Sequence, residues 1–340
     1  MVGSLRSLAS AVGVLAALPL ALAGFSSTSK SNVAVYWGQN SYGQGSGPYV
    51  QERLGYYCQR LTQPQIIPIA FLTSLNPPAM NFANAGDNCT TFPEDPSLLD
   101  CPQIEEDIIA CQAAGKTIIL SLGGATYSGG GFSSSTDAVS TAQNLWAMFG
   151  PAGSNASDSN TSADVLRPFG SAAVDGFDYD FESSTSNMVP FGVELRRLMD
   201  AATASSGKKY YITAAPQCPY PDVANQEALA GGVAFDFIMI QFYNNACGVT
   251  SFVQGATTQP AFNFDVWDTW AKQTSKNPNV KVMLGVPANT GAGAGYTEGA
   301  QLSAAIKYSA QFDSFGGVMM WDMSQLYANS GFLDQVTGAL

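Results

Sequence analysis

Residues 174–184 read "VDGFDYDFESS", a stretch in which acidic and aromatic residues alternate. The acids are Asp178, Asp180 and Glu182. Because alternate side chains of a β-strand share one face, these acids point one way and the aromatic rings between them point the other. Aspartate is a poor strand former, and neighbouring carboxylates repel one another. A strand face that keeps three carboxylates in spite of this indicates a functional role.

Other short apolar segments recur along the chain. Most are β-branched and apolar almost throughout, which is typical of parallel strands covered on both faces. The segments comprise residues 33–37, 66–72, 117–122, 174–181, 210–215, 235–243, 280–286 and 316–321.

Helical patterns lie between these predicted strands. In residues 103–116, Ile104, Ile108 and Cys111 fall on one helical face, and Gly115 stands where such a helix ends. A similar pattern ends at Gly207. Eight alternations of strand and helix predict an α/β fold, a single-domain (β/α)8 TIM barrel. A doubly wound open sheet is the alternative, but no GxGxxG motif follows the first strand.

In a barrel the aromatic residues of the acidic strand pack under the helices, and the acids line the interior. Glu182 comes last, at the C-terminal rim where active sites of this fold lie, and Asp178 lies deepest. Carboxylates so close together cannot all ionise near neutrality, so at least one proton is retained. A proton held by Glu182 makes it a general acid, and Asp180 can share a proton with Asp178. Such groups suit cleavage of glycosidic bonds, whose leaving oxygen must be protonated.

Two other interpretations of the acidic strand remain open on spacing alone. Calcium or magnesium prefers clustered carboxylate oxygens, although calcium loops carry their acids on turns rather than between aromatic residues. An exposed edge strand can also carry charges that deter aggregation, but the aromatic half would then be hard to bury.

Composition narrows the classes of function. The chain has 340 residues, of which 46% are hydrophobic and 12% charged, and it contains no histidine. The lack of histidine excludes Ser-His-Asp and Cys-His catalysis and His-ligated metals, so acid–base chemistry rests chiefly on carboxylates. The net charge of −12 argues against nucleic acid and anionic membranes as partners.

The N-terminal residues have the pattern of a secretory signal. Arg6 precedes an apolar stretch, and Ala21-Leu22-Ala23 is a small-residue cleavage site. We therefore expect a signal peptide over 1–23 and one catalytic barrel domain over 24–340. A membrane anchor is the competing interpretation, but the apolar run is short and no basic cluster follows it.

Export agrees with the six cysteines, an even set without a CxxC pair, which predicts disulfides in an oxidising compartment. A zinc site is disfavoured by these spacings and by the lack of histidine. The sequons at Asn88, Asn155 and Asn160 can carry glycans after secretion.

The spacing Asp175-x-x-Asp178-x-Asp180-x-Glu182 resembles the DxxDxDxE signature of family 18 chitinases. "ILSLGG" at 119–124 is similar to the SxGG motif of that family. Further motifs resemble the plant-type, hevamine-like class III branch, and the whole set runs in order from about residue 32 to 333. These further motifs are "YWGQN" at 36–40, "TAAPQCP" at 213–219, "QFYNN" at 241–245 and "GGVMMW" at 316–321.

The resemblance implies catalytic roles for Glu182, Asp180, Asp178 and Tyr243. Glu182 matches the acid that protonates the glycosidic oxygen, while the substrate's own 2-acetamido oxygen attacks the sugar and gives an oxazolinium intermediate. Asp180 matches the residue that orients the acetamido N–H, and Asp178 tunes Asp180 from below. Tyr243 matches the tyrosine that holds the acetamido group; without the family it reads as an aromatic core residue. Asp175 has the opposite parity on the strand and is expected to be structural.

The same resemblance implies substrate-binding positions and disulfide partners. Trp321 matches the apolar floor under the distorted sugar, and the segment containing Asn81 is longer than its plant counterparts. The substrate-binding residues are Tyr36, Gln39, Phe71, Asn81, Gly124, Gln241 and Trp321. The implied pairs are Cys58 with Cys111, Cys89 with Cys101, and Cys218 with Cys247, whereas the cysteines alone leave the pairing open.

The sequence thus predicts a secreted, extracellular endochitinase that hydrolyses β-1,4-linked N-acetylglucosamine polymers with retention of configuration. Its expected partners are chitin or chitin oligosaccharides, with no nucleic acid and no membrane anchor, and the expected state is a monomer. No cofactor and no metal are expected. The alternatives are a non-catalytic chitin-binding lectin on the same barrel, and an endoglycosidase or lysozyme-like hydrolase. Retention of Glu182, Asp180 and Tyr243 disfavours the lectin.

Overall fold

The structure is a computed structural model that describes residues 24–153 and 165–340. The predicted signal peptide over 1–23 and the sequons at Asn155 and Asn160 lie outside the described residues. Asn88, the remaining sequon, is exposed at the end of a short 3-10 helix, Ala83–Asn88.

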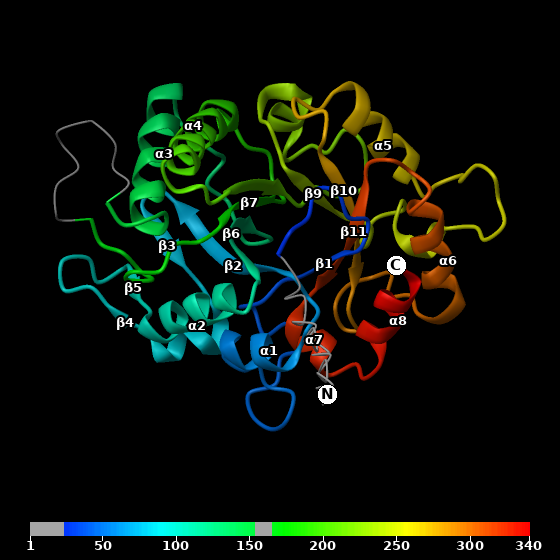
Figure 1. Cartoon of the computed structure of the whole chain (residues 1–340), viewed down its shortest axis with the longest axis horizontal. Coiled ribbons are helices and arrows are strands. Elements are labelled where there is room, and N and C mark those ends of the chain that lie inside the picture. The colour runs from blue at the N-terminus through cyan, green and yellow to red at the C-terminus, as the bar shows by residue number, and fades with distance from the viewer. Residues whose placement is uncertain (1–23, 154–164) are drawn as a thin grey trace, which may run out of the picture.

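Eight parallel strands form a closed barrel in the described part of the chain, because β1 pairs with both β2 and β11. Figure 1 shows these strands at the centre of the molecule. Their bounds are β1 Asn32–Val35, β2 Ile66–Leu75, β6 Thr117–Gly124, β7 Gly176–Phe181, β8 Tyr211–Ala214, β9 Phe237–Gln241, β10 Lys281–Pro287 and β11 Phe315–Trp321. The predicted (β/α)8 barrel is confirmed, and the open sheet is excluded.

Among the described residues, three further strands lie outside the barrel. β3 (Pro78–Met80) adds to β2 in antiparallel fashion, at the C-terminal end of that strand. β4 (Thr90–Thr91) and β5 (Leu99–Asp100) form a small antiparallel pair of their own. All three belong to the long connection between β2 and β6, so this connection extends beside the barrel mouth.

Helices surround the strands on the outside (Figure 1). The α-helices are α1 Leu54–Arg60, α2 Pro102–Ala113, α3 Ser135–Phe149, α4 Met188–Ser206, α5 Phe264–Gln273, α6 Gly299–Ser309, α7 Met323–Tyr327 and α8 Phe332–Ala339. A second 3-10 helix spans Val249–Ser251.

The connection from β8 to β9 differs from the predicted alternation. Its helical part is short: residues 226–227 lead into a π-helical turn at Ala228–Gly232. Gly231 has φ +89°, a left-handed conformation that interrupts a helix and that glycine adopts without steric cost. Residues 215–225, which directly follow the C-terminal end of β8, form no helix. Active-site groups of barrels come from such segments.

The two helices predicted from the sequence, one over residues 103–116 and one that ends at Gly207, correspond to α2 and α4. Ile104, Ile108 and Cys111 of α2 are all at least 98% buried. Gly207 follows α4 with φ +76°, and its N–H donates to the carbonyl of Thr203. This left-handed glycine is a common end to a helix.

The acidic strand β7 has the two faces that its alternation predicts. Phe177, Tyr179 and Phe181 are at most 1% exposed and belong to the outer core between strands and helices. The ring of Tyr179, for example, lies 5.9 Å from the ring of Phe191 on α4. Asp178 lies on the other face and is fully buried. The aromatic side chains therefore hold β7 against the helices while the acids face the barrel interior.

Three disulfides join the cysteine pairs that the family resemblance implies: Cys58–Cys111, Cys89–Cys101 and Cys218–Cys247. The first connects α1 to α2. The last connects the loop after β8 to the loop after β9, both at the mouth of the barrel. Disulfides of this kind are expected of proteins that fold in an oxidising compartment.

Candidate active site

Asp178 is the deepest of the three acids and is held by hydroxyl groups from β6, from β8 and from the residue that directly follows β1. Tyr36 and Ser121 donate hydrogen bonds to its Oδ2, and Thr213 donates to its Oδ1, each at 2.7 Å. Burial raises the pKa of Asp178, and these hydroxyl donors oppose that rise. A buried carboxylate without a cation needs such donors, because desolvation alone would neutralise it. Asp178 is therefore a buried carboxyl group that three hydroxyl donors hold in place under the mouth.

Asp180 lies one step nearer the mouth and is 3% exposed. The Nε2 amide of Gln241 donates to its Oδ1 at 3.0 Å and also to the carbonyl of Ala215 at 3.0 Å. Burial raises the pKa of Asp180 well above its ordinary value, and the charges of Glu182 and Asp178 raise it further. The buried Asp180 thus lies between two other carboxyl groups, and this proximity disfavours simultaneous ionisation of all three.

Glu182 follows the last residue of β7 and lies on the rim, where water reaches its carboxylate. The wall of the pocket still surrounds this group on most sides, and that partial burial raises its pKa. A hydrogen bond from Gln241 opposes the rise, and the negative charge of Asp222 adds to it. A raised pKa keeps a glutamic acid protonated in weakly acidic solution, as a general acid requires.

Tyr243 approaches the same space from the end of β9. Its side chain is 6% exposed, and burial followed by the charges of Asp180 and Glu182 raises the pKa of its hydroxyl well above the ordinary value. The hydroxyl therefore keeps its proton and can act as a hydrogen-bond donor toward a ligand.

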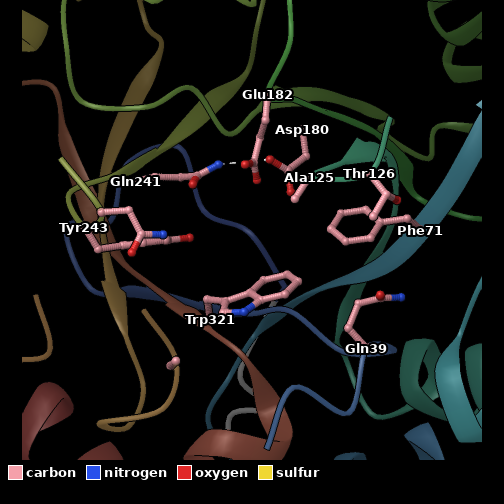
Figure 2. Close-up of a pocket in the computed structure, with 11 residues that line it drawn as sticks. Gln39, Phe71, Ala125, Thr126, Asp180, Glu182, Gln241, Tyr243 and Trp321 are labelled. Carbon is pink, nitrogen blue, oxygen red and sulfur yellow. Dashed lines mark hydrogen bonds between the residues drawn. The ribbon is translucent and has the colours of Figure 1, made fainter. Parts of the chain in front are cut away.

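These side chains surround one open pocket of about 210 Å³. Figure 2 shows Glu182 and Asp180 on one side of it, Gln241 and Tyr243 on a second, and Trp321 across from the acids. The lining residues are Gln39, Phe71, Ala125, Thr126, Asp180, Glu182, Gln241, Tyr243, Asn244, Ala292 and Trp321. The pocket thus lies at the C-terminal ends of the barrel strands, where this fold builds its active sites.

Aromatic rings form the apolar part of the pocket. Trp321 ends β11, and its ring lies 5.8 Å from Phe71 in a nearly parallel arrangement. The ring of Tyr36 lies 5.4 Å from Trp321 on another side. Flat apolar surfaces of this kind match the C–H faces of a sugar ring, while the carboxylates match its polar groups.

Three predicted binding residues do not line the pocket. Tyr36 acts one step away, through its hydrogen bond to Asp178. Gly124 lies under Phe71, since a Cβ there would come within 2.8 Å of that ring. The Asn81 side chain accepts a hydrogen bond from the N–H of Ala83 and is exposed, and its carbonyl accepts a hydrogen bond from Gln39.

Four lining residues were missed from the sequence: Ala125, Thr126, Asn244 and Ala292. Ala125 and Thr126 directly follow the SxGG segment, and Asn244 directly follows Tyr243. Their position just beyond strand ends was a usable signal, because such residues lie at the mouth of a barrel. Ala292 lies in a glycine-rich loop and has no side-chain chemistry that would reveal it.

The acids of the pocket are not arranged as a metal centre. Within residues 24–153 and 165–340, no group of three or more His, Cys, Asp or Glu side chains is placed to hold a metal ion. Asp175, the first acid of the motif, accepts from the N–H of Ile118 at 2.7 Å and pairs with Lys208 at 2.6 Å. This acid therefore stabilises the start of the strand, as its parity predicts.

Each helix in the described part of the chain is too short or too polar to cross a bilayer.

Comparisons with known proteins agree with this geometry. Residues 32–300 match the profile of glycosyl hydrolases family 18. Endochitinase 33 of Trichoderma harzianum is 53% identical over 334 residues, which cover 98% of this chain and 99% of that protein. A class III chitinase of Arthroderma benhamiae is 48% identical over 342 residues, covering 99% and 94% of the two chains.

Solved structures give the same result. The ICChI chitinase from Ipomoea carnea has a TM-score of 0.66 at 26% identity, with 91% of this chain and all of that chain covered. A xylanase and α-amylase inhibitor protein from Scadoxus multiflorus has a TM-score of 0.65 at 26% identity, with 91% and 98% covered. Because the family profile spans most of the chain and the relatives align over nearly all of it, this protein belongs to glycosyl hydrolase family 18 and is a glycoside hydrolase.

Proposed function

We propose that this protein is a secreted endochitinase, which hydrolyses β-1,4-linked N-acetylglucosamine polymers through assistance by the substrate's own acetamido group. The observation that carries this proposal is the position of Glu182 on the pocket rim, above the buried pair of Asp180 and Asp178. The printed names of two close relatives, an endochitinase and a class III chitinase, support the choice of substrate.

In the first step, Glu182 gives its proton to the glycosidic oxygen as the bond from this oxygen to the anomeric carbon breaks. The acetamido oxygen of the same sugar attacks the anomeric carbon from the other face and forms a cyclic oxazolinium ion. In the second step, Glu182 removes a proton from a water molecule, and this water opens the ring. Two inversions at one carbon leave the product with the original β configuration.

Asp180 and Tyr243 have the placement needed to assist the acetamido group. Asp180 accepts a hydrogen bond from its N–H, which turns the acetamido oxygen toward the anomeric carbon and stabilises the positive charge that develops. The Tyr243 hydroxyl donates to the acetamido oxygen. Preorganised groups of this kind act strongly in a pocket that excludes bulk water.

The experiment compares chitin tetrasaccharide with cellotetraose, which has the same linkage but a hydroxyl in place of the acetamido group. We expect the purified protein to release shorter sugars from the chitin substrate alone, and we expect Glu182→Gln to lose that activity while it still binds the substrate. Hydrolysis of cellotetraose at a similar rate would contradict assistance by the acetamido group. Equal hydrolysis by the wild type and Glu182→Gln would contradict the role of Glu182.

A second candidate is a carbohydrate-binding or inhibitory protein on the same barrel. The inhibitor from Scadoxus multiflorus shares the fold at 26% identity. The same experiment distinguishes this candidate from an enzyme, because a binding protein would bind the chitin tetrasaccharide and release no shorter sugars. Peptidoglycan as a third substrate tests the lysozyme-like alternative.

The remaining features of the proposal concern the protein's location and assembly. We propose cleavage of residues 1–23 on export, glycosylation at the exposed Asn88, and action as an extracellular monomer with neither cofactor nor metal. Three disulfides agree with an oxidising compartment. Mass measurement of the secreted protein checks the cleavage and the glycan, and activity that persists in EDTA is expected if no metal takes part.

A further inference from the structure

A buried turn after β8 lies directly behind the acid strand. Asp222 and Asn225 form this turn and are 4% and 2% exposed. The Asp222 carboxylate accepts hydrogen bonds from the N–H of Gln217 at 3.0 Å, the N–H of Asn225 at 2.7 Å and the Asn225 side-chain amide at 3.1 Å. All three partners are donors, which favours the ionised carboxylate and opposes the effect of burial, which raises the pKa of Asp222.

Asn225 connects this turn to the backbone just before the general acid. Its side-chain amide donates to the carbonyl of Phe181 at 3.0 Å, and Phe181 is the residue that precedes Glu182. Its Oδ1 is buried and has no partner among the described residues, so the amide is held through its donor group alone. On the other side of Glu182, the hydroxyl of Thr185 donates to the carbonyl of Ala224 at 2.9 Å. The turn therefore holds the chain on both sides of Glu182.

The turn is itself well anchored. Gln217 forms an isolated parallel bridge with Gln241, the residue whose amide contacts Asp180. The disulfide from Cys218 to Cys247 fixes the same loop to the loop after β9. A group carried on this loop consequently keeps a constant distance from the acids.

Asp222 also acts on the acids through its charge. It raises the pKa of Glu182 and that of Asp180, and it makes no ion pair with any described Lys or Arg side chain that would neutralise it. Several other titratable groups lie around this part of β7: Asp178, Tyr179 and Asp180 on the strand itself, Tyr36 after β1, Tyr127 against Phe181, Glu227 in the connection from β8 to β9, Tyr243 after β9 and Asp322 after β11. A cation that acts on this strand is Arg196 of α4, which interacts with Tyr179 on the outer face of β7, opposite to the acids.

We propose that the Asp222–Asn225 turn is a positioning element for Glu182, with two separable effects. Asn225 fixes the backbone from which Glu182 extends, and Asp222 supplies a buried negative charge behind it that helps Glu182 to keep its proton. This inference rests on the proposed role of Glu182 as general acid, and it adds a fourth carboxylate, outside the DxxDxDxE spacing, to the control of that acid.

The first test uses Asp222→Asn, which keeps the shape of the side chain and removes its charge. The pKa of Glu182 should fall, so the alkaline limb of the kcat/KM profile on chitin tetrasaccharide should move to lower pH. We expect a shift of roughly 0.5–1 pH unit, less than the 1–3 units that a directly adjacent charge produces. Asp222→Glu retains the charge and should leave the limb where it is in the wild type.

The matched control is Asp268→Asn. Asp268 on α5 is 6% exposed and lies away from the pocket. Its carboxylate accepts hydrogen bonds from the N–H and the hydroxyl of Ser314 and forms an ion pair with Lys272 at 2.9 Å. This variant should leave the limb unchanged. An unmoved limb in Asp222→Asn, or an equal shift in Asp268→Asn, overturns the electrostatic part of the proposal.

The second test uses Asn225→Ala, which removes the contact to the Phe181 carbonyl and leaves Asp222 in place. The kcat should fall by about tenfold with little change in KM, because the substrate still binds while the proton donor loses its position. An unchanged kcat overturns the positioning part. A wild type without any chitinase activity contradicts the proposed function instead, so failure of the two ideas is distinguishable.

Discussion

The hydroxyl of Tyr36, the residue that directly follows β1, donates to the carboxylate of Asp178 on β7 at 2.7 Å, and the two residues are 142 positions apart in the chain. The contact spans the inside of the barrel and joins the first strand to the acid strand. With Ser121 and Thr213, it gives the buried carboxylate three hydroxyl partners. Hydroxyl groups of the barrel, and not a cation, thus supply the polar partners of the deepest acid of the site.

Tyr36→Phe should weaken both stability and activity. One of three donors to a buried carboxylate is lost, so the free energy of unfolding at neutral pH should fall by about 1.5–3 kcal/mol, typical for a bond to a charged group. The pKa of Asp178 should rise further, and the kcat on chitin tetrasaccharide should fall. Denaturant unfolding and steady-state kinetics measure the two effects.

Tyr57→Phe is the matched control for this variant. Tyr57 is another buried tyrosine, whose hydroxyl accepts from the N–H of Glu52 at 3.0 Å, away from the pocket. It should lose stability and keep its kcat. Equal losses of kcat in both variants would show that the effect of Tyr36 is general destabilisation.

Asp180→Asn should stabilise the protein at neutral pH while it removes activity. Burial and neighbouring carboxylates raise the pKa of Asp180 in the folded state above its ordinary value of 3.8. The contribution of Asp180 to the free energy of unfolding is therefore fully present below pH 3.8, and it is lost as the pH rises through the raised pKa. Asparagine can still accept the hydrogen bond from Gln241 and cannot ionise. We expect a gain of about 1–2 kcal/mol at pH 7 by denaturant unfolding, as replacement of unfavourable buried charge often gives.

The pH dependence of that gain is its own control. Below about pH 3, aspartic acid is protonated in both the folded and the unfolded state, so the difference between Asp180→Asn and the wild type should nearly vanish. A gain that is constant from acidic to neutral pH would contradict a raised pKa at Asp180.

Trp321→Ala should chiefly weaken substrate binding. The change removes the ring opposite the acids and its contact with Phe71 at 5.8 Å. We expect KM for chitin oligosaccharides to rise by about tenfold, with partial recovery in Trp321→Phe because an aromatic face remains. Titration of the inactive Glu182→Gln background with tetrasaccharide measures binding directly. A KM unchanged in Trp321→Ala would remove this residue from the sugar site.

Loss of the Cys218–Cys247 disulfide should affect both stability and the site. The two cysteines are 29 positions apart. For a disulfide that closes a loop of this length, the free energy of unfolding should fall by about 3–4 kcal/mol when both cysteines are replaced by serine. Because this disulfide anchors the loop that carries Asp222, kcat should fall as well. Cys89 and Cys101 form a disulfide within the β2–β6 connection, between the end of the 3-10 helix Ala83–Asn88 and the residue before α2. Their replacement should lower the melting temperature and leave kcat intact. The opposite pattern would contradict a role of the mouth loops in catalysis.

Much of the fold was predictable because β7 carries a local, periodic signal. Alternation over six residues fixes which side chains face inward, and the chain order of the strands fixes which end of β7 is the mouth. The positions of Asp180 and Glu182 at the inner face and the rim follow from this alternation, and so does the interpretation of Glu182 as a general acid. The roles of Tyr243 and Trp321, and assistance by the substrate's acetamido group, follow from the family resemblance alone.

The parts that escaped prediction depend on contacts between distant, irregular segments. Asp222 stands in a loop without a periodic pattern, and only folding brings it behind β7. The connection from β8 to β9 was expected to be helical, but the left-handed Gly231 interrupts it. The family resemblance implies a binding position at Asn81, but its side chain accepts a hydrogen bond from the N–H of Ala83 and does not line the pocket.

The most direct measurement compares leaving groups. A nitrophenyl glycoside of chitobiose releases a phenolate that needs no proton, whereas chitin tetrasaccharide releases a sugar alkoxide that does. For the first turnover, Glu182→Gln should lose about 10³-fold in rate on the tetrasaccharide and far less on the nitrophenyl glycoside, while Asp180→Asn should lose on both. An equally large loss by Glu182→Gln on the two substrates would contradict its assignment as the proton donor.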